Sequence, residues 1–178
     1  MSKTKITKQL EDLLAAKFKP RSEFYVFECT LGWNGTEIVD CVMYNCYRDV
    51  YCYEIKQSIN DFHSKAKKSF FGNYNYYVMP LELYNKVKDE IPNGVGVYVA
   101  IDGLEPHSEK DPKRSYIIRH WVEPQPGMKS LHCMVRAQRV ELRADKEVIL
   151  SSMLRCALAD RKSNTIGDRD DCCGEFQK

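Results

Sequence analysis

The sequence predicts an α/β fold built on one mixed sheet, and three observations lead to this prediction. Residues 4–18 carry apolar side chains at helical spacing. Residues 37–44 and 50–57 are two runs rich in β-branched and aromatic side chains, separated by a short polar segment, which is typical of a β-hairpin. Residues 74–101 follow the order strand, helix, strand, which implies a parallel pair joined by a crossover.

Length and composition indicate one globular domain. The 178 residues are 43% hydrophobic and 29% charged, an ordinary balance for a soluble protein with a buried core. The net charge is only +2, so any contact with nucleic acid must be a local patch. We see no signal peptide and no run of about 20 apolar residues, and therefore expect a cytoplasmic location and no membrane. We expect one domain over residues 1–160 and a disordered tail over 161–178.

The N-terminal half supplies most of the expected sheet. Residues 24–31 alternate in polarity and predict the first strand, and a turn at residues 32–35 leads into the hairpin. The two strands of the hairpin follow, so that three antiparallel strands form a meander. Ser58, Asn60 or Asp61 can cap the next helix, which we expect to bury one apolar face. That face is formed by Ile59, Phe62, Ala66 and Phe70.

The C-terminal half is less regular. Residues 73–79 predict a strand, residues 80–90 a helix and residues 96–101 a buried strand. Residues 103–113 predict a polar loop and residues 115–122 an outer strand. For residues 129–143 the pattern fits a helix and a strand equally, and a helix from Asp145 to about Ala159 completes the domain.

Eight cysteines occur without any C-x-x-C pair, and we expect free thiols in a reducing cytosol. Cys41 and Cys52 fall inside predicted strands, where a free cysteine behaves as a small hydrophobic residue. A zinc site is the alternative, although its spacing matches no familiar motif. Its ligands would come from His120, His132, Cys133, Cys172 and Cys173.

Three charged residues interrupt the apolar hairpin. Alternation along residues 50–57 places Glu54 and Lys56 on one face. A turn centred on Tyr47 puts Asp40 directly across from Glu54, roughly 5 Å away. Two neighbouring carboxylates repel each other unless a cation joins them, and Mg²⁺ suits such a site. The alternative is a cross-strand salt bridge on a surface sheet, which contributes roughly 0.2–1 kcal/mol.

This pattern resembles the PD-(D/E)XK nuclease superfamily. The resemblance is carried by Ile38-Val39-Asp40 on one strand and by Glu54-Ile55-Lys56 on the next. The flanking segments are similar to the MmcB-like branch of bacterial and phage proteins, namely GWNGTEIVDCVMYN, CYEIKQSINDFHSKAK and NYNYYVMPLELYNKVKDEIPNGVGVYV. The proline that usually precedes the aspartate is replaced here by Val39. The resemblance implies a restriction-endonuclease-like αβββαβ core with a mixed sheet and C-terminal helical additions.

The resemblance also implies hydrolysis of nucleic-acid phosphodiester bonds, with DNA as the expected substrate and Mg²⁺ or Mn²⁺ as the cofactor. Asp40, Glu54 and the carbonyl of Ile55 would hold the metal, and Lys56 would position or activate water. A glutamate of the first helix often completes such a site, and Glu11 lies beside the apolar stripe of that helix. Glu28 on the following strand is its competitor, and a solvated helix glutamate is the alternative.

Basic residues outside the motif are candidates for contacts with phosphates. Lys65, Lys67 and Lys68 start within two or three helical turns of the motif, and Arg136 and Arg139 belong to an arginine-rich stretch. Solvated surface positions explain these residues equally well.

Two other function classes fit the same residues. One is a catalytically inactive, nuclease-like module that binds DNA or a repair partner, since a fold does not determine a function. The other is an inhibitor or adaptor that uses its surface tyrosines against a protein partner. The patterns determine neither the oligomeric state nor the choice between DNA and RNA.

Overall fold

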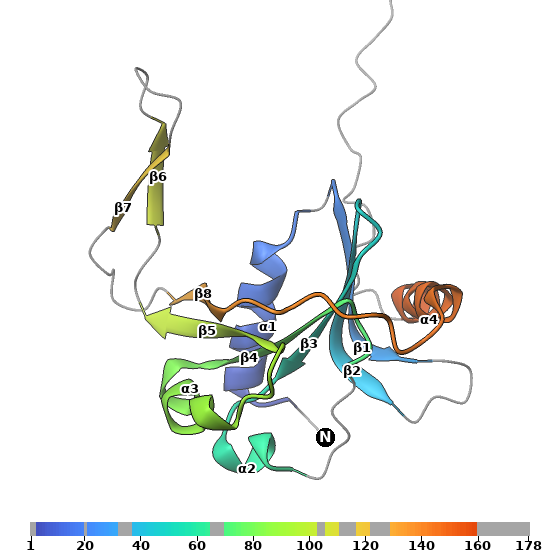
Figure 1. Cartoon of the computed structure of the whole chain (residues 1–178), viewed down its shortest axis with the longest axis horizontal. Coiled ribbons are helices and arrows are strands. Elements are labelled where there is room, and N and C mark those ends of the chain that lie inside the picture. The colour runs from blue at the N-terminus through green and yellow to red at the C-terminus, as the bar shows by residue number, and fades with distance from the viewer. Residues whose placement is uncertain are drawn as a thin grey trace, which may run out of the picture.

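The computed structural model describes residues 3–19, 21–31, 37–64, 70–102, 106–110, 117–121 and 129–159. Over these residues the chain forms a mixed α/β fold (Figure 1). Its elements, in order, are α1 Lys5–Lys17, β1 Glu23–Thr30, β2 Ile38–Asn45, β3 Val50–Ile55, α2 Ile59–Phe62, β4 Tyr74–Pro80, α3 Leu81–Val87, the 3-10 turn η1 Lys88–Glu90, β5 Gly96–Asp102, β6 Pro106–Lys110, β7 Ile117–Trp121, β8 Lys129–Val135 and α4 Lys146–Ala159.

Six strands form the main sheet in the order β1-β2-β3-β4-β5-β8. The strands β1, β2 and β3 are an antiparallel meander, whereas β4 runs parallel to both β3 and β5. The strand β8 returns antiparallel to β5 and forms the second edge. The predicted meander, the predicted parallel pair and the mixed character of the sheet are therefore confirmed.

Helices cover both faces of this sheet. Leu10, Leu14 and Phe18 follow at every fourth position and pack on one face against β2, β3 and β4. On the other face α4 lies over β1, β2 and β3, and α3 lies over β4 and β5 (Figure 1). Alternation along β4 explains why the sheet has an apolar core on each face. Tyr76 and Val78 face α1, whereas Tyr77 and Met79 face α3.

The hairpin of β2 and β3 has the register that the sequence predicts. Cys41 pairs with Tyr53, so the turn is centred on Tyr47. The side chain of Asn45 stabilises this turn, because its Oδ1 accepts hydrogen bonds from the backbone N–H groups of Tyr47 and Asp49 at 3.0 and 2.9 Å. Asparagine forms such bonds with its own turn readily, and local chemistry is thus sufficient to set the register.

The helix after Ser58 is shorter than predicted. It ends at Phe62, and Phe70 lies outside it, while residues 65–69 lie outside the described part of the chain. Phe62 and Phe70 nevertheless pack against the same ring, that of Tyr77, with centroids 5.3 and 5.1 Å apart. Two apolar residues can therefore contact the same partner without lying on one helix. Helical spacing in the sequence does not distinguish this arrangement from a continuous helix that carries both residues.

The segment from residue 103 to residue 143 also differs from the expectation. Residues 106–110 form β6 rather than a loop, because they pair with β7 in a separate two-stranded sheet. The strand expected over residues 115–122 is present as β7, and it belongs to this small sheet, which projects from the main one (Figure 1). Residues 129–143, whose pattern fits a helix and a strand equally, form β8 and then an irregular segment.

The last predicted helices are confirmed. Residues 80–90 form α3 and η1, although Pro80 ends β4 and precedes the helix. Asp145 accepts a hydrogen bond from the backbone N–H of Glu147 at 2.8 Å and so caps α4. The tail predicted for residues 161–178 lies outside the described residues. Within the described residues no helix is long and apolar enough to cross a membrane.

Substitution of Gly96 by alanine is expected to destabilise the fold. A Cβ atom at this position would lie 2.2 Å from Cε1 of Tyr76 and 2.6 Å from the backbone nitrogen of Ala137. The second neighbour is backbone and cannot rotate away, so we expect a loss of about 1–3 kcal/mol in the free energy of unfolding. Urea denaturation measures it, with Asn93→Ala as an exposed control; equal midpoints would contradict the prediction.

Candidate functional site

The sheet opens locally at Asp40. The pairing of β1 with β2 skips Glu28 and Asp40, although it continues in the same register on both sides. Glu28 has a φ angle of 51°, which is uncommon for a residue with a side chain. The pairing of β2 with β3 begins at Cys41, one residue after Asp40, and does not include Asp40. Both neighbouring ladders are thus interrupted at the same point of β2.

The side chain of Asp40 takes the place of the missing backbone partner. Lys56 donates its backbone N–H to β4, so the N–H of Ile55 points the other way, toward β2. That N–H donates to Oδ2 of Asp40 at 2.7 Å. Because the N–H and C=O of a strand residue point to the same neighbour, the carbonyl of Ile55 also faces the side on which Asp40 lies.

Glu54 and Lys56 form a buried ion pair. Their exposed fractions are 4% and 6%, and Nζ of Lys56 lies 3.6 Å from Oε2 of Glu54. Alternation along the strand predicts that they share a face, and this contact agrees with it. Removal of two charges from water is costly, and a buried pair of this kind is therefore a candidate functional site.

Asp61, for which the sequence predicts only the role of a helix cap, is a further member of this cluster. Its Oδ1 lies 3.9 Å from Nζ of Lys56, and its Oδ2 accepts from the backbone N–H of Gln57 at 3.0 Å. Ser58 is the actual cap of α2, because its Oγ accepts from the N–H of Asp61. The spacing Ser-x-x-Asp is the signal that could have placed Asp61 in the first turn beside the motif.

Glu11 and Glu28, between which the sequence does not decide, meet at one cation. Nζ of Lys3 lies 2.5 Å from Glu11 and 2.7 Å from Glu28. Burial lowers the pKa of Lys3, but the hydrogen bonds to these two carboxylates and their negative charges together outweigh this effect, so the pKa is raised. No pattern in the sequence predicts this role for Lys3.

The start of α1 is attached to the end of the motif strand. Thr4 caps α1 by accepting from the N–H of Thr7, and its hydroxyl also donates to Oε1 of Gln57. Because Gln57 directly follows Lys56, this contact joins the start of α1 to the residue after the motif.

The environment of Asp40 raises the pKa of its carboxyl group. Burial is the largest cause; the hydrogen bond from Ile55 and the charge of Lys56 oppose it, while Asp61 and Glu11 add to it. Glu11 therefore lies close enough to act on Asp40. Within the described part of the chain, no three side chains of the His, Cys, Asp or Glu type lie together in a way that could hold a metal ion.

Replacement of Asp40 by asparagine is expected to maintain or raise the melting temperature in metal-free buffer at pH 8. The carboxyl group of Asp40 binds its proton more tightly in the folded protein than in the unfolded chain. The stability of the parent protein therefore falls as the pH rises through the raised pKa of Asp40. Asparagine removes this cost and keeps an oxygen for the N–H of Ile55. The difference from the parent should shrink as the pH falls toward about 4, the ordinary range of aspartate.

Differential scanning calorimetry from pH 8 to pH 4 measures this effect, with exposed Asp12→Asn on α1 as the control. A loss of more than about 4 °C at pH 8, equivalent to about 1 kcal/mol or more, would contradict the prediction. Asp40 would then be a structural partner of Lys56.

Two of the five predicted nucleic-acid contacts, Arg136 and Arg139, belong to the part of the chain that the structure describes. Lys65, Lys67 and Lys68 lie outside the described residues. Arg136 and Arg139 are exposed in the irregular segment after β8. Their predicted role stays a prediction.

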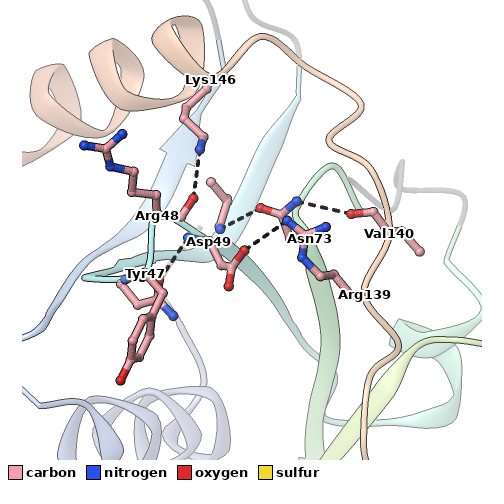
Figure 2. Close-up of polar contacts among 9 residues, drawn as sticks. Tyr47, Arg48, Asp49, Asn73, Arg139, Val140 and Lys146 are labelled. Carbon is pink, nitrogen blue, oxygen red and sulfur yellow. Dashed lines mark hydrogen bonds and ion pairs between the residues drawn. The ribbon is translucent and has the colours of Figure 1, made fainter.

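Figure 2 shows Arg139 beside Asp49, which directly precedes β3 at the end opposite to Ile55. Its Nη2 lies 3.3 Å from Oδ1 of Asp49, next to the hairpin turn, and the side chain of Asn73 accepts from the N–H of Val50 there. From Val50 to Ile55 the strand rises about 16 Å. Arg139 therefore does not contact the same phosphate as a group beside Ile55.

A groove of about 770 Å³ lies next to the charged cluster. It is lined by Gln57 and Ser58, by the first residues of α2, and by residues where β4 and β5 end. The charged residues of the motif do not line it. The groove therefore adjoins the cluster and is distinct from it.

The described cysteines are free thiols, as expected. Cys29, Cys41 and Cys52 are buried in the two main cores, where burial raises the pKa of each thiol. These three cysteines serve as core residues in the structure.

The fold and the site define a mixed α/β protein whose sheet opens at a carboxylate beside a buried ion pair. No family model matches the chain, and no curated protein matches it. Its structure is similar to that of the SPO1766 protein of unknown function from Silicibacter pomeroyi, with a TM-score of 0.60 and 13% sequence identity. The match covers 89% of this chain and 90% of that chain. At this identity the similarity shows the fold alone.

Proposed function

We propose that this protein is a divalent-metal-dependent nuclease of the PD-(D/E)XK type. The order α1-β1-β2-β3-α2-β4 supports the restriction-endonuclease-like αβββαβ core that the proposal requires. The observation that carries it is the opening of the sheet at Asp40, next to the buried pair of Glu54 and Lys56. Charged groups at such an opening fit a reaction site better than a surface salt bridge, since the pair is buried.

Asp40 and Glu54 would hold the metal, and the carbonyl of Ile55 would add a backbone oxygen. These donors fit Mg²⁺ or Mn²⁺, because Mg²⁺ is usually held by one or two carboxylates while water and substrate phosphate occupy its other positions. A cluster of three acidic side chains is not required. When bound, the metal polarises the phosphoryl oxygen and generates a nucleophile from water at neutral pH.

Lys56 would act directly on the reacting groups. Its ammonium is oriented by Glu54 and Asp61 and can position the attacking water or neutralise the charge that develops on the phosphate. Glu11 would complete the site as a carboxylate from α1 close to Asp40, and Lys3 engages it in this structure. DNA remains the expected substrate because of the resemblance, and a cytoplasmic location remains an expectation.

The test is nicking of supercoiled plasmid and cleavage of single-stranded DNA in Mn²⁺. We expect Asp40→Asn and Glu54→Gln each to lower the rate at least about 100-fold, and each to remove Mn²⁺ binding in calorimetry. Asp89→Asn, in exposed η1, is the matched control and should retain both. Unchanged cleavage in Asp40→Asn and Glu54→Gln would reject the proposal.

The second candidate is a nuclease-like module that binds nucleic acid or a protein partner without cleavage. The specific observation in its favour is that Lys3 engages Glu11, the third acidic residue of the proposed site. Salt-dependent binding of DNA without cleavage in any divalent metal would select this candidate. If the protein bound no DNA at all, the remaining function class would be the inhibitor or adaptor that binds a protein partner.

A further inference from the structure

We propose that the groove beside the charged cluster binds one or two unstacked nucleotides of the substrate strand. This inference rests on the proposed nuclease function and adds a substrate class, namely single-stranded or locally opened nucleic acid. Neither the motif nor the similar structure assigns any role to the groove.

The groove lies where a bound strand would continue from the reaction site. It is at the carboxyl ends of the parallel strands β3, β4 and β5, and open α/β sheets bind ligands outside such ends. Gln57 and Ser58 directly follow Lys56 and line the groove. Asp61 contacts both Lys56 and the backbone of Gln57, so one helix, α2, borders both sites.

The chemistry of the lining fits a base better than a phosphate. Ile6, Ile59, Leu81 and Ile101 supply apolar surface from four different elements. The two charged lining residues have opposite signs and are Glu82 and Lys86. A lining without net charge does not attract phosphate, whereas apolar side chains can pack against the face of any base.

The size and the polar groups of the groove agree with this occupant. Its volume of about 770 Å³ falls in the range of about 300–1,000 Å³ typical of small-ligand pockets. The amide group of Asn60 can donate to and accept from base edges, and the amide nitrogen of Gln57 can donate to them, since its oxygen already accepts from Thr4. A paired duplex keeps its bases in the stack and would present only sugars and phosphates here. The groove therefore selects unpaired nucleotides.

The test measures binding in EDTA, so that it is independent of cleavage. The probes are a fluorescent twelve-residue oligothymidylate and the same strand annealed to its complement. We expect the parent to bind the single strand more tightly than the duplex. The double variant Ile6→Ser/Ile59→Ser should lose at least about five-fold in single-strand affinity. Its matched control is Val148→Ser/Leu154→Ser, since these apolar residues of α4 are exposed to a similar or greater extent.

A second measurement does not depend on the variants. Titration with thymidine monophosphate should shift the isoleucine methyl signals of Ile6, Ile59 and Ile101 in NMR spectra of the parent, and leave those of Ile38 and Ile149 in place. Equal affinity of parent and groove variant for the single strand, equal affinity of parent for both probes, or no shift of these signals would each overturn the inference.

The outcomes for the groove and for the nuclease are distinguishable. Groove-dependent binding without cleavage in Mn²⁺ would retain the groove and reject the nuclease. Cleavage in Mn²⁺ by a protein whose single-strand affinity is unchanged in the groove variant would retain the nuclease and reject the groove. No binding of either probe would reject the groove whatever the cleavage assay shows.

Discussion

Replacement of Lys56 by methionine is expected to lower the free energy of unfolding by about 3–5 kcal/mol and to abolish cleavage. Lys56 and Glu54 are both almost fully buried, and the substitution removes the cation that lies 3.6 Å from Oε2 of Glu54. Loss of one member of a buried pair leaves the other charge uncompensated in a place with little water. Urea denaturation at pH 7 measures the loss of stability.

A second substitution separates stability from activity. Glu54→Gln in the same chain removes the remaining charge, so the double variant should recover most of the lost stability. It should not recover cleavage, because both proposed groups of the reaction are then absent. Lys88→Met in exposed η1 is the control and should change stability by less than about 0.5 kcal/mol.

Two outcomes would contradict this account. If Lys56→Met left stability unchanged, the pair would contribute nothing to the fold. If the double variant cleaved DNA at the parent rate, Lys56 and Glu54 would have no part in the reaction. The two measurements are independent, so either part of the prediction can fail alone.

Replacement of Leu14 by alanine is the second substitution with a large expected effect, a loss of about 2–5 kcal/mol. Leu14 is fully buried in α1 and packs in the same core as Tyr53, Ile55 and Val78. Truncation removes apolar contacts and leaves a cavity, because a helix packed across three strands cannot move inward freely. Denaturation in urea measures the loss.

The matched control for this prediction is Leu154→Ala on α4. Leu154 is also a helical leucine, but 58% of its surface is exposed, and we expect a change within about 0.5 kcal/mol. Leu14→Ala protein that remains folded at low temperature should keep its Mn²⁺ binding, since Asp40 and Glu54 lie on strands. Equal losses in both variants would show that α1 is not docked as described.

The central hairpin was predictable because its signals are local. Asn45 and the residues after it form a tight turn, and alternation then places every later side chain of β3. The register that puts Asp40 across from Glu54 follows from that turn alone. The sequence alone therefore predicts that Asp40, Glu54 and Lys56 lie close together, without any information on tertiary contacts.

The local opening of the sheet was not predictable. Alternation assumes that ladders continue, and nothing in the residues around Asp40 indicates that both end there. The left-handed φ angle of Glu28 occurs opposite this point, where Lys3 binds both Glu28 and Glu11. Such a contact joins a residue before the first helix to a strand 25 positions later, and sequence patterns carry no information on it.

Patterns of polarity and turn chemistry were sufficient for the α/β class, the meander, the parallel pair and the identity of the three charged residues, because these features depend on neighbours in the chain. The short length of α2, the pairing of β6 with β7, the place of Arg139 at the far end of β3 and the groove at the strand ends depend on contacts between distant segments. Backbone pairing and packing decide those features. Both can override local propensity, because a single segment can neither satisfy all its backbone hydrogen bonds nor bury its apolar surface alone.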